Sequence, residues 1–430
     1  MGIFEQVIKY LPLSSGWFTG GIFRLCSNEL VSKYLRHRDS ILVKHIKDLK
    51  RLLVISDVNI GDAVTIQSCI ETFRCYFPDS EIDYAYSNAA DPIINKNPHI
   101  SNTFPLFSTS LTPSKGEAAS IRELLKNKPY DLVINFCPFL SGKYLRNTGC
   151  PVLSPVRLAI DIIRERHKRN GNTHISYYTT QYIHQLFNEL PENTAPQKEK
   201  PTYSGSKIYL PRDIFSARDN CLKSLGISPQ DVILYFNPDT SNSYTFINQS
   251  LQIRLLKMLL QYDNFDWLLL GSGIKFKGIE KKLYDKIPST LQKKIIVLND
   301  TLPLDVYASL LDVCDVFLTG DTGPMHIAAA RKICVDDDCF FRNRVAVIGI
   351  FGATDSKIYG YDSFKTGYMC ANQNAPSKVF EASPPCKTLA CSIQRLAHEC
   401  SRGRCFEGID IDAIVAYVTE YLSSLRSRAS

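Results

Sequence analysis

The chain has 430 residues, of which 44% are hydrophobic and 22% are charged. These values are ordinary for a globular protein of two or three domains, and they exclude a disordered chain, a collagen-like chain and a coiled coil. No apolar run is long enough for a transmembrane helix. Most of the formal net charge of +7 comes from residues 1–51, and the nearly neutral remainder argues against a nucleic-acid-binding protein.

The N-terminal segment 1–50 precedes the first expected strand and is basic. Its bulky hydrophobic residues close to the basic stretch include Trp17, Phe18, Ile22 and Phe23. This combination is typical of an interfacial anchor on an anionic membrane. The alternative is a helical extension that packs on the body of the protein. A cleaved signal peptide is not expected, because the start lacks a clean positive region.

From residue 51 onwards, predicted strands and helices alternate. Three apolar runs predict strands at 51–56, 81–86 and 131–136. A helix is predicted at 62–77, because apolar residues recur there at three- and four-residue spacing. The stretch 191–206 is rich in proline, serine and charge, and it predicts a linker.

After the linker the alternation restarts. Strands are predicted at 231–236, 267–270, 316–319 and 345–348. Helices are predicted at 249–262, 304–312, 324–331 and 411–425. Two such series predict two doubly wound, Rossmann-like α/β domains with parallel sheets and a cleft between them.

The predicted domain organisation has four parts. They are a basic extension at 1–50, an N-terminal Rossmann-like domain at 51–205, a C-terminal Rossmann-like domain at 206–408 and a closing helix at 409–430. Ligands are expected at the carboxyl ends of the strands, so the loops there are the candidate sites.

The first candidate loop is 57–62, between a strand and a helix. Gly61 permits a close backbone approach, and Asp62 would project from the start of the helix. A carboxylate at that place can accept a proton from a hydroxyl group. The alternative is that Asp62 only caps the helix, where aspartate is favoured.

Two further loops carry groups suited to phosphate. Loop 237–243 has clustered hydroxyls and amides, although an ordinary polar loop is the alternative. In the stretch 319–330, Pro324 fits the first helical position, and the free N–H groups of the helix start would make an anion site for a diphosphate. His326, one turn in, would reach the same anion; the alternative is a core histidine satisfied by its neighbours.

The 14 cysteines fall into two groups. Those within apolar runs of the first 330 residues are interpreted as small buried hydrophobic residues, namely Cys69, Cys75, Cys137 and Cys314. A C-terminal cluster is a candidate structural Zn or Fe site, made of Cys370, Cys386, Cys391, Cys400 and Cys405. Disulfides and free thiols are the alternatives. A chain of this length needs no disulfides to fold, which favours a reducing compartment.

These motifs resemble those of the heptosyltransferases, glycosyltransferase family 9 of the two-Rossmann-domain GT-B type. The most specific stretch is 321–330, DTGPMHIAAA, which looks like the family's nucleotide-diphosphate motif. The supporting stretches are Gly61-Asp62, Phe77-Pro78-Asp79, 130–134 and 351–355. The resemblance covers roughly residues 51–426.

The resemblance implies an inverting transferase that moves a heptose or related sugar from an ADP-sugar to a lipopolysaccharide-core-type glycolipid, with a protein hydroxyl as the alternative acceptor. Asp62 would be the general base, with Asn59 and Gly61 in the acceptor loop. The donor would be held by Thr240, Ser241, Asp321, Thr322, Gly323 and His326. The chemistry would not require a metal. We expect a cytoplasmic protein that contacts the inner face of the cytoplasmic membrane through residues 1–51.

The sequence departs from the family pattern after the second loop. The family usually has a Lys-x-Trp-Pro-like element there, whereas residues 243–248 read SYTFIN, without lysine. A cation expected near the phosphate or sugar is therefore missing. This departure leaves two alternatives: the donor differs from ADP-heptose, or the chain is a non-catalytic GT-B protein that binds a nucleotide sugar.

Overall fold

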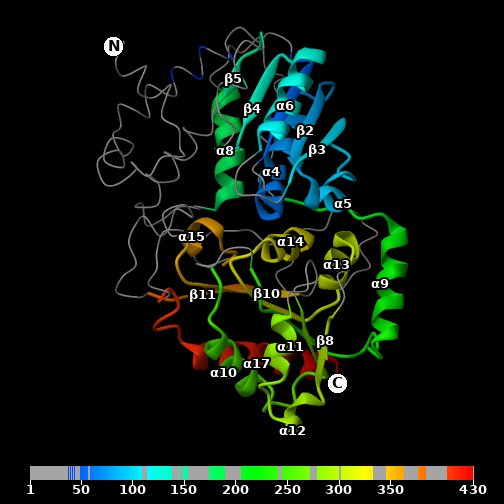
Figure 1. Cartoon of the computed structure of the whole chain (residues 1–430), viewed down its shortest axis with the longest axis vertical. Coiled ribbons are helices and arrows are strands. Elements are labelled where there is room, and N and C mark those ends of the chain that lie inside the picture. Colours follow the sequence, from blue (N-terminus) through cyan, green and yellow to red (C-terminus); the bar gives the residue numbers. More distant parts are fainter. Residues whose placement is uncertain are drawn as a thin grey trace. The chain divides into compact units, whose positions relative to one another are not determined.

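The computed structural model folds into two compact units. Unit 1 comprises Met1–Asn170 and Ile175–Tyr203, and unit 2 comprises Gly171–His174 and Ser204–Ser430 (Figure 1). The described residues are 37, 39, 41, 43, 49–56, 59–108, 114–137, 145, 149–153, 174–188, 205–240, 245–271, 278–299, 302–332, 345–362, 376–383 and 404–429.

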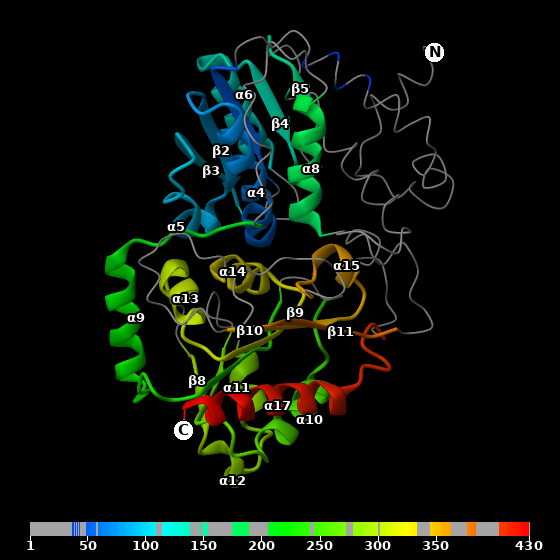
Figure 2. The ribbon, with the colours of Figure 1, turned by 180° about the vertical axis from the view of Figure 1, so that it is seen from behind.

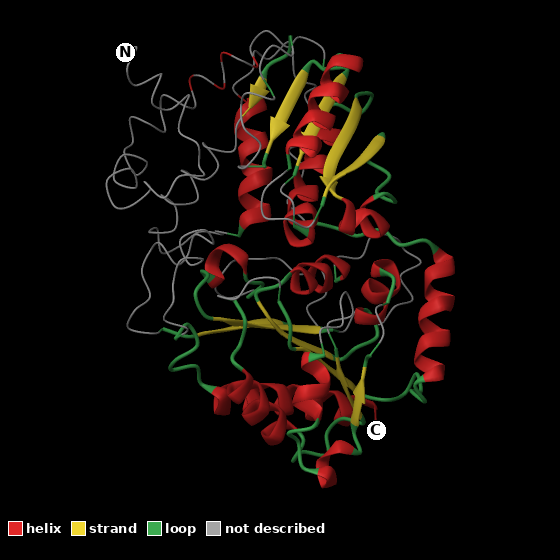
Figure 3. Cartoon of the chain, in the orientation of Figure 1, coloured by secondary structure: helices red, strands yellow, loops and turns green. Residues whose placement is uncertain are grey.

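Unit 1 is built on a parallel sheet with the strand order β3-β2-β1-β4-β5 (Figure 3). Its strands are β1 (Arg51–Ile55), β2 (Glu81–Ser87), β3 (Asn102–Phe107), β4 (Leu132–Asn135) and β5 (Val152–Leu153). Its helical elements are α4 (Ile60–Tyr76), η1 (Asn88–Ala90), α5 (Asp91–Ile94), α6 (Lys115–Asn127) and α8 (Ile175–Asn188).

Helices cover both faces of this sheet. On one face, Ile121 of α6 packs in a hydrophobic cluster with Leu53 and Ala85. Neighbouring strand residues point to opposite faces. Accordingly, Tyr84 lies on the other face and donates a hydrogen bond to the carbonyl of Ala63 in α4, at 2.8 Å. Helix α8 packs against α4. The sheet is thus buried on both sides, as its near-continuous apolar strands predict.

Unit 2 is built on a second parallel sheet, with the strand order β11-β10-β9-β6-β7-β8. Its strands are β6 (Ile233–Asn237), β7 (Trp267–Leu270), β8 (Ile295–Val297), β9 (Val316–Gly320), β10 (Ala346–Phe351) and β11 (Ser377–Glu381). Its helices are α9 (Arg212–Ser224), α10 (Gln249–Leu259), α11 (Ile279–Tyr284), α12 (Ser289–Gln292), α13 (Leu304–Leu311), α14 (Gly323–Arg331), α15 (Ser356–Tyr359) and α17 (Ile411–Ala429).

The helices of unit 2 also lie on both faces of their sheet. Figures 1 and 2 show α10 and α17 on one face and α13 and α14 on the other. Leu255 of α10 and Val418 of α17 belong to one buried cluster with Phe236 and Leu318 of the strands. On the opposite face, the ring of Tyr307 in α13 packs edge-on against Tyr235 of β6. Both sheets are therefore doubly wound.

The strand orders place the candidate loops. In unit 1 the chain builds outward from β1 to β3 and then returns to the other side of β1 with β4. In unit 2 it builds from β6 to β8 and then returns to the other side of β6 with β9. Ligands of such sheets bind at the carboxyl ends of the strands where the order reverses. The loops after β1, β6 and β9 all lie at these positions.

The two parallel sheets confirm the predicted α/β GT-B fold class. Predicted strands and helices lie where expected, with boundaries that differ by up to three residues except for a longer C-terminal helix. The prediction of a buried Cys75 is wrong: the residue is exposed, because it points away from the helix face that holds Phe73 and Tyr76. Cys69, Cys137 and Cys314 are buried as predicted. Within the part of the chain that is described, no helix is long and apolar enough to cross a membrane.

Candidate active-site residues in the two units

The loop after β1 in unit 1 leads into α4. Asn59 is the N-cap, with extended backbone angles, and its carbonyl accepts from the N–H of Ala63 at 3.0 Å. The helix therefore starts before Asp62, which is its third residue and not its cap. The capping alternative for Asp62 is wrong, because Asn59 already occupies that position. Gly61 is buried in the first turn between them.

The carboxylate of Asp62 is held by one identified neighbour. The Asn59 side-chain amide donates to Oδ2 of Asp62 at 2.9 Å. Burial raises the pKa of Asp62 above its ordinary value, and the hydrogen bond from Asn59 offsets part of that increase. A carboxylate with a raised pKa is a stronger proton acceptor once it is ionised. The environment of Asp62 therefore suits a general base.

The loops after β6 and β9 are joined by a hydrogen-bonded cluster. Asn237 and Thr319 are register partners on the adjacent strands β6 and β9. The Asn237 amide donates to Oγ1 of Thr319 at 2.9 Å and to the carbonyl of Asp239 at 3.1 Å. The hydroxyls of Thr319 and Thr322 lie 3.1 Å apart. This cluster ties both loops to the carboxyl edge of the sheet.

The polar atoms of this cluster are two hydroxyls and a buried acceptor. Thr319 Oγ1 accepts from the Asn237 amide, and either hydroxyl of the Thr319–Thr322 pair can donate to the other, because a hydroxyl oxygen has two lone pairs. Asn237 is 1% exposed, and its Oδ1 is a buried acceptor with no hydrogen-bond partner among the described residues. The cluster thus places hydroxyl groups beside a buried acceptor.

Helix α14 begins at Gly323, directly after the cluster. Thr322 is the N-cap, but its side chain makes no capping hydrogen bond, and it contacts Thr319 instead. Pro324 is the second helical residue and not the first as predicted, because the helix already begins at Gly323; its fixed φ still fits the first turn. The partial positive charge of a helix start favours an anion here. Asp321 is buried beside this start, at 6% exposure.

His326 lies one turn into α14 and is buried. Its Nδ1 is 2.8 Å from the hydroxyl of Tyr361, and the two rings meet edge-on. Burial lowers the pKa of His326 to about 4, so the imidazole is neutral near pH 7. Nε2 has no hydrogen-bond partner among the described residues. Nδ1 therefore fits the alternative of a core histidine satisfied by its neighbours, whereas Nε2 does not.

The other predicted donor-site residue that the structure describes is Thr240. Its Oγ1 is 2.8 Å from Oγ1 of Thr245, and its N–H donates to the Asp239 carboxylate at 2.8 Å. Gly320 lies next to this turn, where a Cβ would be 3.2 Å from the carbonyl of Thr245. The close approach of the two loops explains why glycine ends β9. Ser241 lies outside the described residues.

The C-terminal end of α14 is fixed by a buried ion pair. The single Nε–H of Arg331 is shared between the two oxygens of the Asp312 carboxylate, and Nη2 donates to Oδ2, at 2.6–3.1 Å. Its Nη1 donates to the carbonyl of Ile208 at 2.6 Å. Alanines 328–330 are buried against the rest of unit 2, and Met325 packs against the Cα of Gly349 in β10. The helix that carries His326 is therefore held at both ends.

The candidate metal residues are mostly outside the described part of the chain. Cys370, Cys386, Cys391 and Cys400 are not described, and Cys405 is partly buried. Among the residues that the structure describes, no group of three or more potential ligands comes together.

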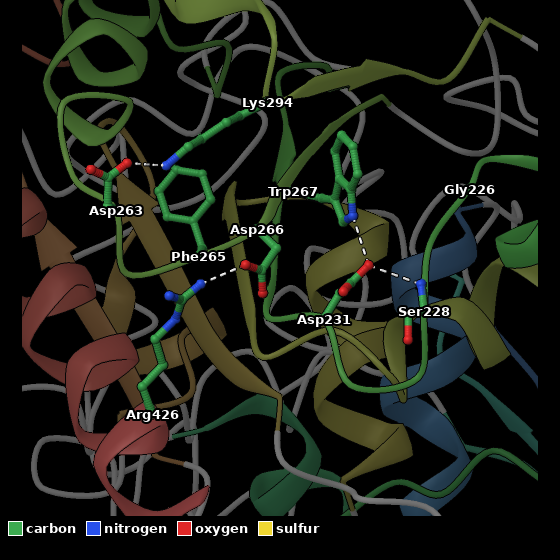
Figure 4. A pocket seen from close by; sticks show the side chains of 9 residues that line it. All are labelled: Gly226, Ser228, Asp231, Asp263, Phe265, Asp266, Trp267, Lys294 and Arg426. Carbon is green, nitrogen blue, oxygen red and sulfur yellow. Dashed lines mark hydrogen bonds and ion pairs between the residues drawn. The ribbon is translucent and has the colours of Figure 1, made fainter. Parts of the chain in front are cut away.

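A hollow of about 610 Å³ lies elsewhere on unit 2 and is not a candidate active site. Figure 4 shows that its charged side chains pair with one another: Lys294 with Asp263, and Arg426 with Asp266. The indole N–H of Trp267 donates to Asp231 at 2.7 Å. These contacts join the loops before β6 and β7 to α17, so the polar groups of this hollow have a structural role.

Sequence reasoning included Asn237 and Thr319 in the candidate loops without giving either an individual role, and it missed Tyr361 and His174. A signal existed for the first two, since each is a polar residue at the end of an apolar strand, in ILYFN and VFLTG. No local signal marked Tyr361 or His174. Their rings lie 4.5 Å apart, although they come from distant parts of the chain.

Comparisons with known proteins bear on the resemblance that the motifs indicated. Residues 255–387, which include β9 and α14, match the family model of glycosyltransferase family 9 (heptosyltransferase). Among curated protein sequences, none matches this chain. The resemblance indicated by the motifs is confirmed for residues 255–387.

Solved structures match over most of the chain. A family 9 glycosyltransferase from Veillonella parvula is 15% identical, with a TM-score of 0.59, over 87% of this chain and 98% of that one. The E. coli ADP-heptose LPS heptosyltransferase II is 14% identical, with a TM-score of 0.56, over 87% and 99%. The E. coli heptosyltransferase WaaC with ADP is 15% identical, with a TM-score of 0.53, over 86% and 99%. These similarities show a shared GT-B fold.

Proposed function

We propose that this chain, whose second unit carries the family 9 glycosyltransferase signature, transfers a heptose or related sugar from an ADP-sugar with inversion. The observation that carries the proposal is the start of α14, where Thr322 and His326 place an uncharged hydroxyl and an uncharged imidazole beside a helix N-terminus. Such an arrangement stabilises the negative charge that develops on a departing diphosphate. The ADP bound in one structural relative supports this choice of nucleotide.

In the proposed reaction, an acceptor hydroxyl attacks the anomeric carbon while Asp62 takes its proton. The bond from the anomeric carbon to the β-phosphate oxygen breaks, and ADP leaves with the electron pair. The helix start, Thr322 and His326 receive the charge on ADP. A single displacement without an enzyme nucleophile inverts the anomeric configuration. The raised pKa of Asp62 fits its role, because a base is most effective when its pKa lies near the working pH.

Calorimetric titration with ADP, using UDP and GDP as controls, tests the donor site. We expect ADP to bind best, and we expect Thr322→Ala and His326→Ala to weaken it. Thr419→Ala is the matched control, since its hydroxyl bonds only within α17. Preference for UDP or GDP would refute an ADP-sugar donor. A folded chain that binds no nucleotide would refute the transferase proposal and favour loss of activity.

For the acceptor we propose a lipopolysaccharide-core-type glycolipid, with a protein hydroxyl as the alternative. The basic segment 1–51, most of which lies outside the described residues, supports the glycolipid because it would hold the enzyme near anionic headgroups. Sedimentation of the full chain with anionic and with neutral vesicles tests this. Binding to anionic vesicles alone, lost when the lysines and arginines of 1–51 are replaced by glutamine, is expected. Equal partitioning would refute the membrane contact.

For the C-terminal cysteines we propose a structural Zn or Fe site that the chemistry does not use. Four or five thiols within 36 residues would suffice for tetrahedral coordination. Elemental analysis of the purified chain tests this, with Cys391→Ser compared with Cys221→Ser as the control. Metal at one equivalent that is lost only in Cys391→Ser is expected. Absence of metal from chain purified without chelator would refute the site.

A further inference from the structure

Tyr361 is the residue on which the inference depends, and it lies between two histidines of unit 2. Its hydroxyl is 2.8 Å from Nδ1 of His326, and its ring packs against that of His174 with centroids 4.5 Å apart. All three side chains are buried. The tyrosine follows α15 and is outside the family-like stretches that the sequence indicated.

Resting on the proposed function, we infer that Tyr361 is a positioning residue that donates its hydroxyl hydrogen to Nδ1 of His326 and so keeps the imidazole proton on Nε2, directed to the donor's diphosphate.

The direction of the hydrogen bond follows from the chemistry of the two groups. A neutral imidazole carries one N–H, and the nitrogen that lacks it accepts. If Nδ1 carried the proton, Nε2 would present a lone pair to a phosphate anion and repel it. With the phenol as donor, Nε2–H becomes a donor to phosphate oxygen. The hydrogen-bond partner at one ring nitrogen therefore sets which of the two nitrogens carries the proton.

The second ring contact limits the movement of Tyr361. The imidazole of His174 forms a hydrogen bond with the backbone of Tyr359, two residues before Tyr361. Burial, and to a smaller extent His326, lowers the pKa of His174 to about 3, so both histidines are neutral above pH 5. Two neutral rings can pack on one tyrosine without charge repulsion. Tyr361 is thus fixed by packing on one side and by a hydrogen bond on the other.

The variant Tyr361→Phe removes only the hydroxyl and keeps the ring packing. Nitrogen-15 NMR of labelled protein, without ligand, reports which imidazole nitrogen of His326 is protonated and at what pH the ring titrates. The His326→Asn spectrum identifies the signals, and a thermal melt confirms that the variant is folded. The control is Tyr417→Phe, a half-buried tyrosine elsewhere in unit 2 that packs on Phe380.

The position of the imidazole proton decides the direction of the hydrogen bond. If Tyr361 donates, Nδ1 of the neutral ring lacks a proton; if Tyr361 accepts, Nδ1 carries it. The pKa does not distinguish the two cases, because the phenol can turn and accept from Nδ1–H once the ring is protonated. We expect a proton on Nε2 in the unaltered chain and in Tyr417→Phe, and a mixture of the two tautomers in Tyr361→Phe.

Titration with ADP then measures the consequence. Loss of one oriented neutral donor predicts about three- to tenfold weaker binding in Tyr361→Phe, and unchanged binding in Tyr417→Phe. A proton on Nδ1 in the unaltered chain, or an unchanged tautomer in Tyr361→Phe, would overturn the inference even if ADP binds. Failure of the unaltered chain to bind ADP would instead refute the proposed function, and the NMR result distinguishes the two failures.

Discussion

The loop after β1 in unit 1 and the loop after β9 in unit 2 stand at the same place in their sheets, beside the point where the strand order reverses. They carry different chemistry. The first offers a carboxylate whose pKa is raised by burial and which one amide contacts. The second offers hydroxyl and imidazole groups that are uncharged near neutral pH and that contact further residues.

Under the proposed function, this difference matches the two halves of a displacement reaction. A general base needs one acceptor atom and a tuned pKa, so few neighbours suffice. A leaving-group site needs several donors whose hydrogens already point at the anion, because reorientation during the reaction would cost free energy. In unit 2, Asn237, Thr319 and Tyr361 contact the groups of the proposed leaving-group site. In unit 1, Asn59 is the one described residue whose side chain contacts the Asp62 carboxylate.

Replacing the carboxylate of unit 1 gives the largest expected effect. Asp62→Asn should lower turnover by about 10²–10⁴-fold, the usual contribution of a general base, without weakening ADP binding. Initial rates with an ADP-sugar and calorimetry with ADP measure the two effects. The control is Asp79→Asn, an exposed aspartate close in sequence. If Asp62→Asn weakens ADP binding as strongly as turnover, the separation of roles between the loops is wrong.

The support of α14 should matter for stability. Arg331→Met leaves Asp312 as an unpaired buried carboxylate, and breaking a buried pair costs about 3–5 kcal/mol. The free energy of unfolding of unit 2, measured in urea, should fall by that amount. The control is Arg254→Met, which breaks an exposed pair with Asp412 and should cost less than about 1 kcal/mol. Equal losses of unfolding free energy in the two variants would contradict the role of Arg331 in fixing α14.

A smaller effect is expected from the hydroxyl cluster of unit 2. Thr319→Val keeps the shape but removes the hydroxyl that links Asn237 to Thr322, so Thr322 loses its orientation. We expect ADP to bind about three- to tenfold more weakly, as for loss of one neutral hydrogen bond. In a double-mutant cycle with Thr322→Val, the combined loss should be less than the sum. Additive losses would show that the two threonines act independently.

The smallest effect is expected from Asn59→Ala in unit 1. The amide of Asn59 lowers the pKa of Asp62, so its removal should raise that pKa further. Since only the ionised carboxylate accepts a proton, the acid limb of the rate profile should move to higher pH, with little change above it. The pH dependence of turnover measures this shift. A shift of the acid limb to lower pH would mean that Asn59 does not stabilise the ionised form.

Sequence patterns predicted much of this molecule because they are local. Apolar runs and helical spacing placed both strand–helix series, and Gly61-Asp62 and residues 321–326 marked the loops. Shorter or more polar elements were missed, such as β3 with its exposed and partly exposed residues. The alternatives for Asp62 could not be separated by sequence, because whether a residue is the N-cap or the third helical residue depends on where the first helical hydrogen bond forms.

The sequence by itself determined the alternation of strands and helices, the fold class and the residues of the two loops. Only the tertiary structure decided how those residues are supported. Asn237 reaches Thr319 across 82 residues, and Tyr361 reaches His326 across 35, because parallel pairing brings distant strand ends to one edge. The burial that shifts the pKa values of Asp62 and His326 likewise arises from packing. Sheet register and burial are properties of the whole fold, so no local pattern encodes them.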